Sequence, residues 1–478
     1  TIYIFDLHGN SLKKESCPNG TPDQNVFDIR QGVAIAFFVK KGNKKKTNST
    51  VHHAELWGVR KLKYDWLDTY SLDTMEWSKL NPGSPSYLFV PRDSALETIY
   101  QRYPSVPNIY PVNCVGLFTA RDRLTIGWSV EEIWHQVKTF SQMEPELARQ
   151  AYGLGKDTRD WKVALAQKDL LDSGPQREKI VPVLYRPFDV RYTYYTGRSR
   201  GFICMPRQEV MRHILRGENL TLSVTRSVEI KQNFEHVFCT EDLITNHSVS
   251  LKEANYLFPL YLYRSTDPSN LFANLESKDI QPNLNEHLTP LLNEAYNRNP
   301  SPEQIFHYIY SLLYAPRYRE QYAELLETDF PRIPFTSDGE LFLKIAELGK
   351  RLTELHLLKS SELDPPASRF QGQGDNRVGK GKKEGLRYDQ ENQQVYINPT
   401  QHFTPVPEAV WTYRIGGYQV CEKWLKDRKD RVLELKDIRT YCRIVTALNI
   451  TIEIQKVIDS LYPDIENQTI PLSQISKS

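Results

Sequence analysis

Apolar residues near the start of the chain fall into two compact runs separated by a polar stretch. Residues 2–5 and 32–40 are predicted to form strands. The second run is apolar almost throughout, which predicts burial on both faces of a sheet. Residues 9–25 between them are rich in Asn, Pro and Lys and predict a long loop. Six prolines between residues 82 and 111 divide the next segment into short pieces, which is typical of a connector.

From residue 112 onward, short strands alternate with helices. The spacing of apolar residues predicts a helix over residues 130–140. Strands are predicted at 181–184, 220–224 and 236–239, and the apolar residues 257–263 then close the region. This alternation predicts an α/β lobe that ends near residue 265.

After this lobe the apolar spacing becomes helical. Two apolar faces carry the pattern: Ile305, Ile309, Leu312 and Leu313, and then Leu341, Ile345, Leu348, Leu352 and Leu355. Residues 359–390 are rich in Gly, Lys and Asp and predict a mobile surface segment. Two further helices are predicted close to the C-terminus, at residues 416–426 and 437–458.

These patterns predict a multidomain chain of α/β and α+β class. The predicted regions are a sheet remnant at 1–55, a connector at 56–111, the α/β lobe at 112–265, a helical region at 266–358, a mobile loop at 359–390 and a largely helical C-terminal part at 391–478.

Composition narrows the class of protein. Apolar residues make up 40% and charged residues 25% of the chain, as in ordinary soluble proteins. The longest strongly apolar run, residues 33–39, is far shorter than the roughly 20 residues that span a bilayer. No secretory signal opens the chain, and the six cysteines show no C-x-x-C pair or metal-ligand spacing. We therefore expect a cytoplasmic protein with reduced thiols and no membrane partner.

Charge is nearly balanced overall but not locally. The net charge is +2, whereas residues 185–231 contain nine Lys/Arg against four Asp/Glu and six aromatic residues. A basic, aromatic-rich stretch predicts a surface that binds nucleic acid, because arginine contacts phosphates or guanine and aromatic rings stack on bases. The candidate DNA-binding residues are Arg186, Arg191, Tyr195, Arg198, Arg200, Arg207 and Arg226. The structural alternative pairs Arg186 with Asp189 and places the rings in a core.

Two other classes of function stay open. Asp189 with Glu229 and Lys231 has the residue types of a metal-dependent nuclease, in which carboxylates hold Mg²⁺ and a lysine assists the attacking water. The chain could instead be a non-catalytic interaction scaffold whose helical C-terminus docks onto partner domains. No catalytic constellation in the sequence stands above chance.

Several blocks of sequence resemble one family. Residues 3–10 and 25–35 resemble the last two strands of gamma-class DNA adenine-N6 methyltransferases. Further blocks resemble type ISP restriction-modification enzymes, at residues 185–189, 199–202, 256–263, 329–335 and 414–426. The resemblance spans nearly the whole chain, and its last block is long enough to be specific.

The resemblance implies which domains of a larger enzyme this chain supplies. In that family one polypeptide carries a nuclease, a helicase-like ATPase, an adenine methyltransferase and a target-recognition domain. This chain would supply the end of a Rossmann-like methyltransferase sheet and the specificity domain, which reads duplex DNA. Its partners would be double-stranded DNA and the upstream methyltransferase domain of the same polypeptide. A first residue other than methionine, Thr1, standing directly before a strand, agrees with a fragment.

Cofactor and catalytic motifs are missing from the sequence. It has no glycine-rich S-adenosylmethionine loop, no Asn-Pro-Pro-Tyr motif and no Walker motif. The resemblance therefore implies that S-adenosylmethionine, ATP and Mg²⁺ bind upstream, and we expect this chain alone to be inactive as a methyltransferase.

One site residue follows from the resemblance. In gamma-class enzymes an aromatic residue just before the last strand stacks on the flipped-out adenine, and Phe27 occupies the matching place. The alternative is that Phe27 packs in the core of the sheet.

Overall fold

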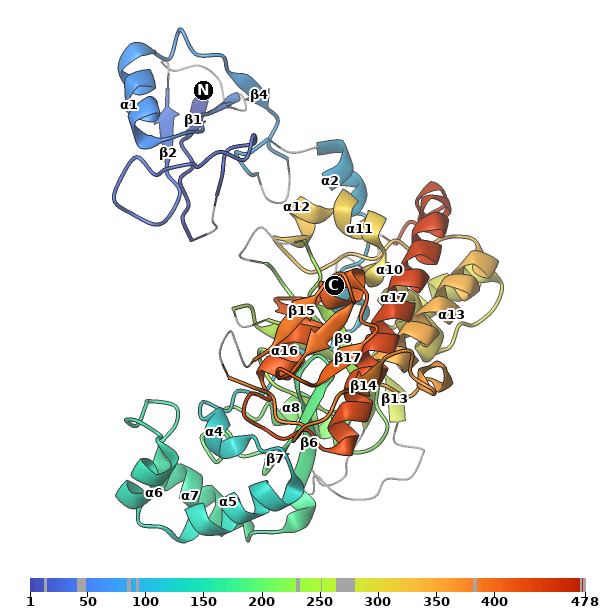
Figure 1. The fold of residues 1–478 in the computed structure, drawn as a ribbon. Coiled ribbons are helices and arrows are strands. Elements are labelled where there is room, and N and C mark those ends of the chain that lie inside the picture. The colour runs from blue at the N-terminus through green and yellow to red at the C-terminus, as the bar shows by residue number, and fades with distance from the viewer. Residues whose placement is uncertain are drawn as a thin grey trace. The chain divides into compact units, whose positions relative to one another are not determined.

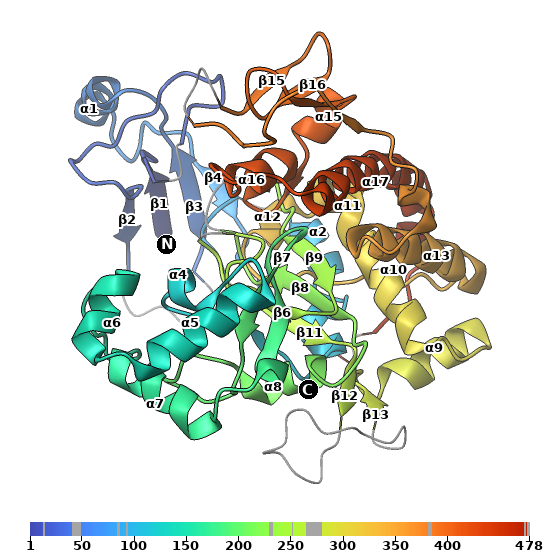
Figure 2. The same ribbon diagram turned by 60° about the horizontal axis from the view of Figure 1, so that its bottom comes forward.

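The computed structural model describes residues 1–12, 15–40, 49–83, 87–91, 94–228, 233–250, 252–263, 280–380, 385–472 and 475. The chain forms two compact units. Unit 1 comprises Thr1–Gln101, and unit 2 comprises Arg102–Val228 and Asn233–Ser478. Figures 1 and 2 show the elements of both units from two directions.

Unit 1 is built on a four-stranded sheet of order β2-β1-β3-β4. Its strands are β1 (Ile2–Asp6), β2 (Ala34–Phe38), β3 (Val51–Glu55) and β4 (Ser78–Leu80), and its helices are α1 (Arg60–Thr69) and α2 (Ser94–Tyr100). Strand β1 runs antiparallel to β2 and parallel to β3. The core gathers Phe5, Leu7 and Val26 with Trp66 and Trp77 packed against them.

This arrangement changes two sequence-based expectations. The unit does not end near residue 55, because β3, α1 and β4 complete the same sheet and core, so much of the predicted connector belongs to unit 1. Strand β2 is not buried on both faces either. It lies at the edge of the sheet, where Phe37 and Phe38 are exposed, and 70% of Phe38 is accessible to solvent.

The region of unit 2 that the sequence predicted as an α/β lobe is built, in its described part, around two larger sheets. One has the order β5-β11-β8-β9 and the other β10-β6-β7. The strands are β5 (Cys114–Val115), β6 (Ile180–Arg186), β7 (Asp189–Tyr194), β8 (Thr221–Thr225), β9 (Val237–Thr240), β10 (Leu243–Ile244) and β11 (Asn255–Pro259). Every residue of β8 and β9 is buried, so this sheet runs through the core.

Helices and a small hairpin surround these sheets. They are α3 (Val106–Ile109), α4 (Asp122–Thr125), α5 (Val130–Gln142), α6 (Pro145–Tyr152), α7 (Val163–Ser173), the 3₁₀ helix η1 (Arg177–Lys179), α8 (Gln208–Ile214), β12 (Tyr261–Tyr263) and β13 (Ile280–Pro282). The Ser129 side chain caps α5 by accepting from the Glu132 N–H, which fixes the start of the predicted helix.

The second half of unit 2 is a layer of packed helices. They are α9 (Leu288–Tyr296), α10 (Pro302–Tyr314), α11 (Pro316–Gln321), α12 (Ala323–Leu326), α13 (Gly339–His356) and α17 (Leu435–Asn467). Helices α10, α13 and α17 lie side by side (Figures 1 and 2). A capping box between Ser301 and Gln304 begins α10. Helices α10 and α13 approach closely at Gly349, where a Cβ atom would lie 1.8 Å from the carbonyl oxygen of His307. Only glycine permits this packing.

The predicted mobile segment at 359–390 contains regular structure in its described part. The 3₁₀ helix η3 (Ser361–Leu363) is followed by strand β14 (Arg369–Gln371), and β15 (Arg387–Asp389) comes later. These strands join β16 (Gln394–Tyr396) and β17 (His402–Thr404) in a sheet of order β14-β17-β16-β15. The polar composition misled the prediction because the partner strands come later in the chain.

The C-terminal part is accordingly mixed rather than largely helical. Besides this sheet it contains α15 (Glu408–Trp411), the hairpin β18 (Arg414–Ile415) and β19 (Tyr418–Gln419), and α16 (Val420–Lys426). The structure is of mixed α and β class, as predicted. Among its described residues no helix is both long enough and apolar enough to cross a membrane.

Candidate nucleic-acid interface

The basic stretch at 185–231 divides into buried and exposed residues. Tyr195 is fully buried, and its hydroxyl donates to the carbonyl oxygen of Pro206 at 2.9 Å. A base cannot stack on this ring, so Tyr195 is a core residue. This corrects its assignment as a DNA-binding residue.

Arg191 is also structural. Its Nε and Nη2 donate to Asp189 Oδ2 at 3.1 and 2.7 Å, and the side chain is nearly buried. The guanidinium lies between the rings of Trp128 and Tyr185, with centroids 3.8 and 4.0 Å away. Arg428 donates to the other carboxylate oxygen of Asp189 at 2.9 Å. Because its charge is neutralised inside the fold, Arg191 is corrected to a residue that holds unit 2 together.

The same network removes Asp189 as a metal ligand. Burial alone would raise the pKa of Asp189, but the Arg428 and Arg191 charges and hydrogen bonds outweigh burial and hold that pKa below its usual value. Two arginines bond its oxygens, and no cluster of at least three His, Cys, Asp or Glu that could hold a metal occurs in the described ranges. Glu229 and Lys231 lie outside the described residues. The nuclease interpretation built on Asp189 is therefore corrected.

Arg186 is buried but does not pair with Asp189. Its Nη1 donates to the carbonyl oxygens of Tyr185 at 2.6 Å and His247 at 3.2 Å. The guanidinium lies over the rings of Tyr185 and Tyr418, 4.1 and 5.2 Å from their centroids. These contacts fix the orientation of the side chain.

The other candidates reach the surface. Arg198 pairs with Asp172 at 2.6 Å, Arg200 lies 3.7 Å from Asp160, and Arg226 pairs with Asp329 at 3.0 Å. Arg207 is half-buried, and its Nη2 donates to the Met205 sulfur at 3.5 Å. Exposed ion pairs contribute little to stability, so the three exposed arginines can exchange a carboxylate for a phosphate at low cost.

Three loops come together around Arg198, Arg200 and Arg207 and form what we call the basic surface, residues 116–123, 153–162 and 196–207. Arg121 Nη2 donates to the carbonyl oxygen of Lys156 at 3.0 Å, which joins the first loop to the second. Trp161 Nε1 donates to the carbonyl oxygen of Phe202 at 3.3 Å, which joins the second to the third. A β-bridge between Phe118 and Met205 joins the first to the third.

The basic surface carries an excess of positive charge. Its three loops contain eight Lys/Arg and three Asp, a net charge of 8 − 3 = +5. The exposed cations are Arg123, Lys156, Arg159, Lys162, Arg198 and Arg200. Sequence reasoning found only the last two of these, because the first two loops carry little local excess of charge. The fold brings the charged side chains of the first two loops next to those of the third loop.

A cavity opens beside the first loop of the basic surface. Its volume is about 250 Å³, and it lies where β6 and β10 end. The lining residues are Leu117, Phe118, Thr119, Ala120, Asp122, Tyr185, Arg186, Thr245, Asn246 and His247. We call it the central pocket. Its walls combine aromatic rings with one cationic and one anionic side chain.

In unit 1 the structure places Phe27 outside the core, with 56% of its surface exposed. Its loop is held firmly: the Phe27 N–H donates to Asn25 Oδ1 at 2.8 Å, and Arg60 donates to the carbonyl oxygens of Asn25 and Phe27 at 2.7 and 2.9 Å. Tyr64 donates to the carbonyl oxygen of Val26. An exposed ring on a braced loop can meet a planar partner without rearrangement.

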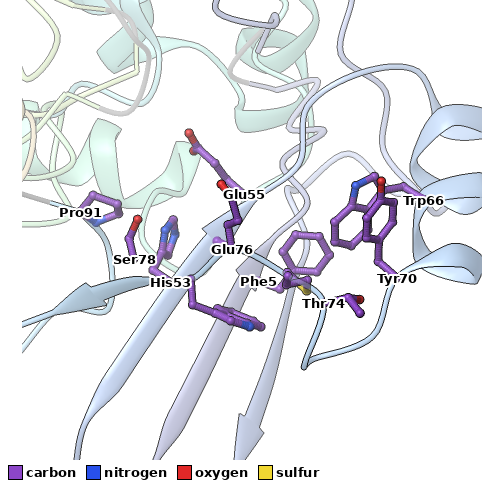
Figure 3. Close-up of a pocket in the computed structure, with 12 residues that line it drawn as sticks. Phe5, His53, Glu55, Trp66, Tyr70, Thr74, Glu76, Ser78 and Pro91 are labelled. Atoms are coloured by element: carbon purple, nitrogen blue, oxygen red, sulfur yellow. The ribbon is translucent and has the colours of Figure 1, made fainter.

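Unit 1 also has a larger cavity, of about 740 Å³, that the sequence did not predict. Figure 3 shows the rings of Trp66 and Tyr70 beside one another, with centroids 4.5 Å apart, and His53 near Ser78 in another part of it. Burial lowers the pKa of His53, so this ring is neutral near pH 7. Unit 1 has no Gly-x-Gly sequence, so its residues do not fit the glycine-rich loop of an S-adenosylmethionine site.

The fold is similar to that of three solved structures in complex with DNA. A cryo-EM structure of the DrdV–DNA complex matches with a TM-score of 0.66 and 20% identity, covering 95% of this chain and 47% of that chain. The ATP-dependent Type ISP enzyme LlaBIII bound to DNA matches with a TM-score of 0.67 and 20% identity, covering 95% and 30%. A nuclease-deletion mutant of the Type ISP enzyme LlaGI with a DNA substrate mimic gives 0.60 and 19%, covering 95% and 43%.

The chain spans less than half the length of each of these three chains. No curated protein matches it. The sequence profile described as the Type ISP C-terminal specificity domain matches residues 108–456. Since that match covers most of the chain and nearly all of unit 2, this protein belongs to the family of Type ISP C-terminal specificity domains.

Proposed function

We propose that unit 2 recognises a specific sequence in duplex DNA and thereby selects the target of a restriction-modification enzyme. The observation that carries the proposal is the basic surface, where three loops bring a net charge of +5 together. Phosphate contacts from lysine and arginine position a duplex, and contacts to base edges choose its sequence. Family membership supports the proposal, and the three similar structures are DNA complexes.

We further propose that unit 1 is the end of a Rossmann-like adenine-methyltransferase sheet. The exposed edge of β2 supports this, because an apolar edge strand is a ready site for pairing with another strand. The partner would be the upstream methyltransferase domain of the same polypeptide. Phe27 would stack on the adenine that this domain flips out of the duplex.

The methyl donor, S-adenosylmethionine, would be held by residues outside this chain, as would ATP and Mg²⁺. The residues of unit 1 do not fit a glycine-rich cofactor loop, so we assign no cofactor contact to this chain. Calorimetry with S-adenosylmethionine checks this assignment: micromolar binding by the 478-residue chain would contradict it.

Salt-dependent binding tests the proposed DNA recognition. The chain should bind a pool of duplexes with an affinity that falls linearly in log–log form as salt rises, by about 0.9 per phosphate neutralised. Sequencing of the bound duplexes after repeated selection should return a preferred site. Binding that is absent or insensitive to salt would favour an interaction scaffold instead.

A further inference from the structure

The central pocket contains Arg186, whose guanidinium is held by hydrogen bonds at one nitrogen and has no hydrogen-bond partner among the described residues at the other two. Arg186 Nη1 is anchored by the carbonyl oxygens of Tyr185 and His247. Its Nε is buried, and neither Nε nor Nη2 forms a hydrogen bond within the part of the chain that the structure describes. The free edge therefore presents two parallel donors, the geometry with which arginine grips two acceptors at once.

The pocket also contains a free acceptor. Asn246 Oδ1 is buried and forms no hydrogen bond to any described residue. An unpaired buried polar atom is unfavourable, by an amount comparable to a lost hydrogen bond. A ligand that satisfies both Arg186 and Asn246 would remove two such penalties.

The size and charge of the pocket limit the ligand. A volume of about 250 Å³ far exceeds the ~10–15 Å³ that one water molecule needs. Burial raises the pKa of Tyr185 to about 12, so its hydroxyl keeps its proton and donates to Asp122 Oδ2 at 2.9 Å. The acidic side chain of Asp122 also lines the pocket and disfavours an anionic ligand beside Arg186. A neutral ligand that offers both acceptors and donors therefore fits better than a phosphate.

We propose that the central pocket reads one G·C base pair, with Arg186 bonding the O6 and N7 acceptors of guanine and Asn246 Oδ1 accepting from the N4 amino group of cytosine. In the major groove a G·C pair shows two acceptors, N7 and O6 of guanine, followed by one donor, the N4 amino group of cytosine. No other base pair shows this order of groups. The inference rests on the proposed recognition of duplex DNA and names the residues that read one of its base pairs. Phe118, exposed at the pocket wall, is placed to touch a neighbouring base edge.

Selection of binding sites from random duplexes tests the proposal. The unaltered chain should select at least one G·C pair, and replacing that guanine with 7-deazaguanine, which lacks the N7 acceptor, should weaken binding. Arg186→Lys should relax the preference at this pair by roughly 5- to 150-fold and leave the other positions unchanged. Asn246→Ala should relax the same pair. The matched control is Arg159→Ala, in an exposed residue of the basic surface, which should weaken all sequences alike.

Each outcome decides one question. Absence of salt-dependent binding would overturn the proposed function and this inference with it. A preferred site that is insensitive to 7-deazaguanine at every selected guanine, or one whose preferences survive Asn246→Ala, would overturn the inference alone. If Arg186→Lys fails to fold, as a lowered melting temperature would show, the 7-deazaguanine and Asn246→Ala arms still decide, because Asn246 anchors no other element through its side-chain oxygen.

Discussion

Arg428 Nη2 donates to Asp189 Oδ1 at 2.9 Å across 239 residues of sequence. The bond joins β7 to the segment between α16 and α17, and Arg191 completes the pairing on the other oxygen. Arg428 also lies over the ring of Trp424, 3.4 Å from its centroid. Two parts of unit 2 that are distant in sequence are therefore clamped by one carboxylate.

Replacing that carboxylate should destabilise unit 2 severely. Asp189→Asn removes the buried carboxylate that both arginines bond directly, and leaves Arg191 and Arg428 only the more distant Asp427 and Asp437, each at 3.8 Å. Removing one partner of a buried ion pair costs about 3–5 kcal/mol. Urea denaturation should show a loss of this size in the free energy of unfolding. The control is Asp172→Asn, which breaks the exposed pair with Arg198 and should change stability by less than about 0.5 kcal/mol. Equal stability of the two variants would refute the clamp.

The basic surface should control affinity through charge. Arg159→Ala should weaken binding to all duplexes and lower the slope of log affinity against log salt by about one, because one phosphate contact is lost. Lys456→Ala removes another exposed, ion-paired cation, from α17 outside the basic surface, and should leave the slope unchanged. Titrations at several salt concentrations measure both. The same slope in wild type and Arg159→Ala would exclude Arg159 from the interface.

Phe27 should affect methylation and not folding. The ring is exposed, so Phe27→Ala should change the free energy of unfolding by less than about 0.5 kcal/mol. In the full-length enzyme the loss of a base–aromatic stack, worth about 1–3 kcal/mol, should slow methylation roughly 5- to 150-fold. The control is Leu62→Ala, which removes another exposed apolar side chain of unit 1. Normal methylation by Phe27→Ala would show that the ring does not hold the target base.

Acid should weaken unit 2 through buried histidine. His356 lies between the hydroxyls of Tyr310, at 2.6 Å, and Thr451, at 3.1 Å, and burial lowers its pKa from 6.5 to about 3. Below pH 6.5 the unfolded chain therefore binds a proton at His356, whereas the folded chain binds this proton only near pH 3. The stabilisation is complete above pH 6.5 and is lost as the pH falls through this window.

Unfolding measurements at two pH values test this effect. Between about pH 7.5 and about pH 5, His356 alone should account for a loss of about 2 kcal/mol. His356→Gln should be less stable than wild type near neutral pH and should lose about 2 kcal/mol less on acidification. Burial also lowers the pKa values of His213, His236 and His307 to about 4, so these residues add to the pH dependence that persists in the variant. An unchanged pH dependence in His356→Gln would rule out this contribution.

The longest helices were predictable from the sequence. The helix predicted at 130–140 is α5, and the one predicted at 437–458 lies within α17, which continues to Asn467. The apolar face predicted for α10 is buried throughout. In α13 the predicted Ile345, Leu352 and Leu355 are buried, whereas Leu341 and Leu348 are only half-buried. Helical periodicity relates residues that are three or four positions apart in the sequence. A single segment contains all of these residues, so its helical face can be predicted without knowledge of the rest of the chain.

Pairing between distant segments was not predictable in the same way. Strand β3 was missed because its residues, Val51–Glu55, include two adjacent histidines and alternate weakly, and it is a strand because β1 pairs with it. Strand β14 falls in a polar stretch that predicted mobility, and its partner β17 begins at His402.

The amino-acid sequence alone indicated the family resemblance, the four longest helices among the described residues and the presence of a basic, aromatic-rich stretch. Tertiary structure decided which of those basic residues face solvent. Arg191 is buried because Asp189 and two aromatic rings surround it, whereas Arg159 and Lys162 join the basic surface from a loop with little charge excess of its own. The physical reason is that charge composition is a property of a segment, whereas burial and ion pairing depend on which distant segments fold against it.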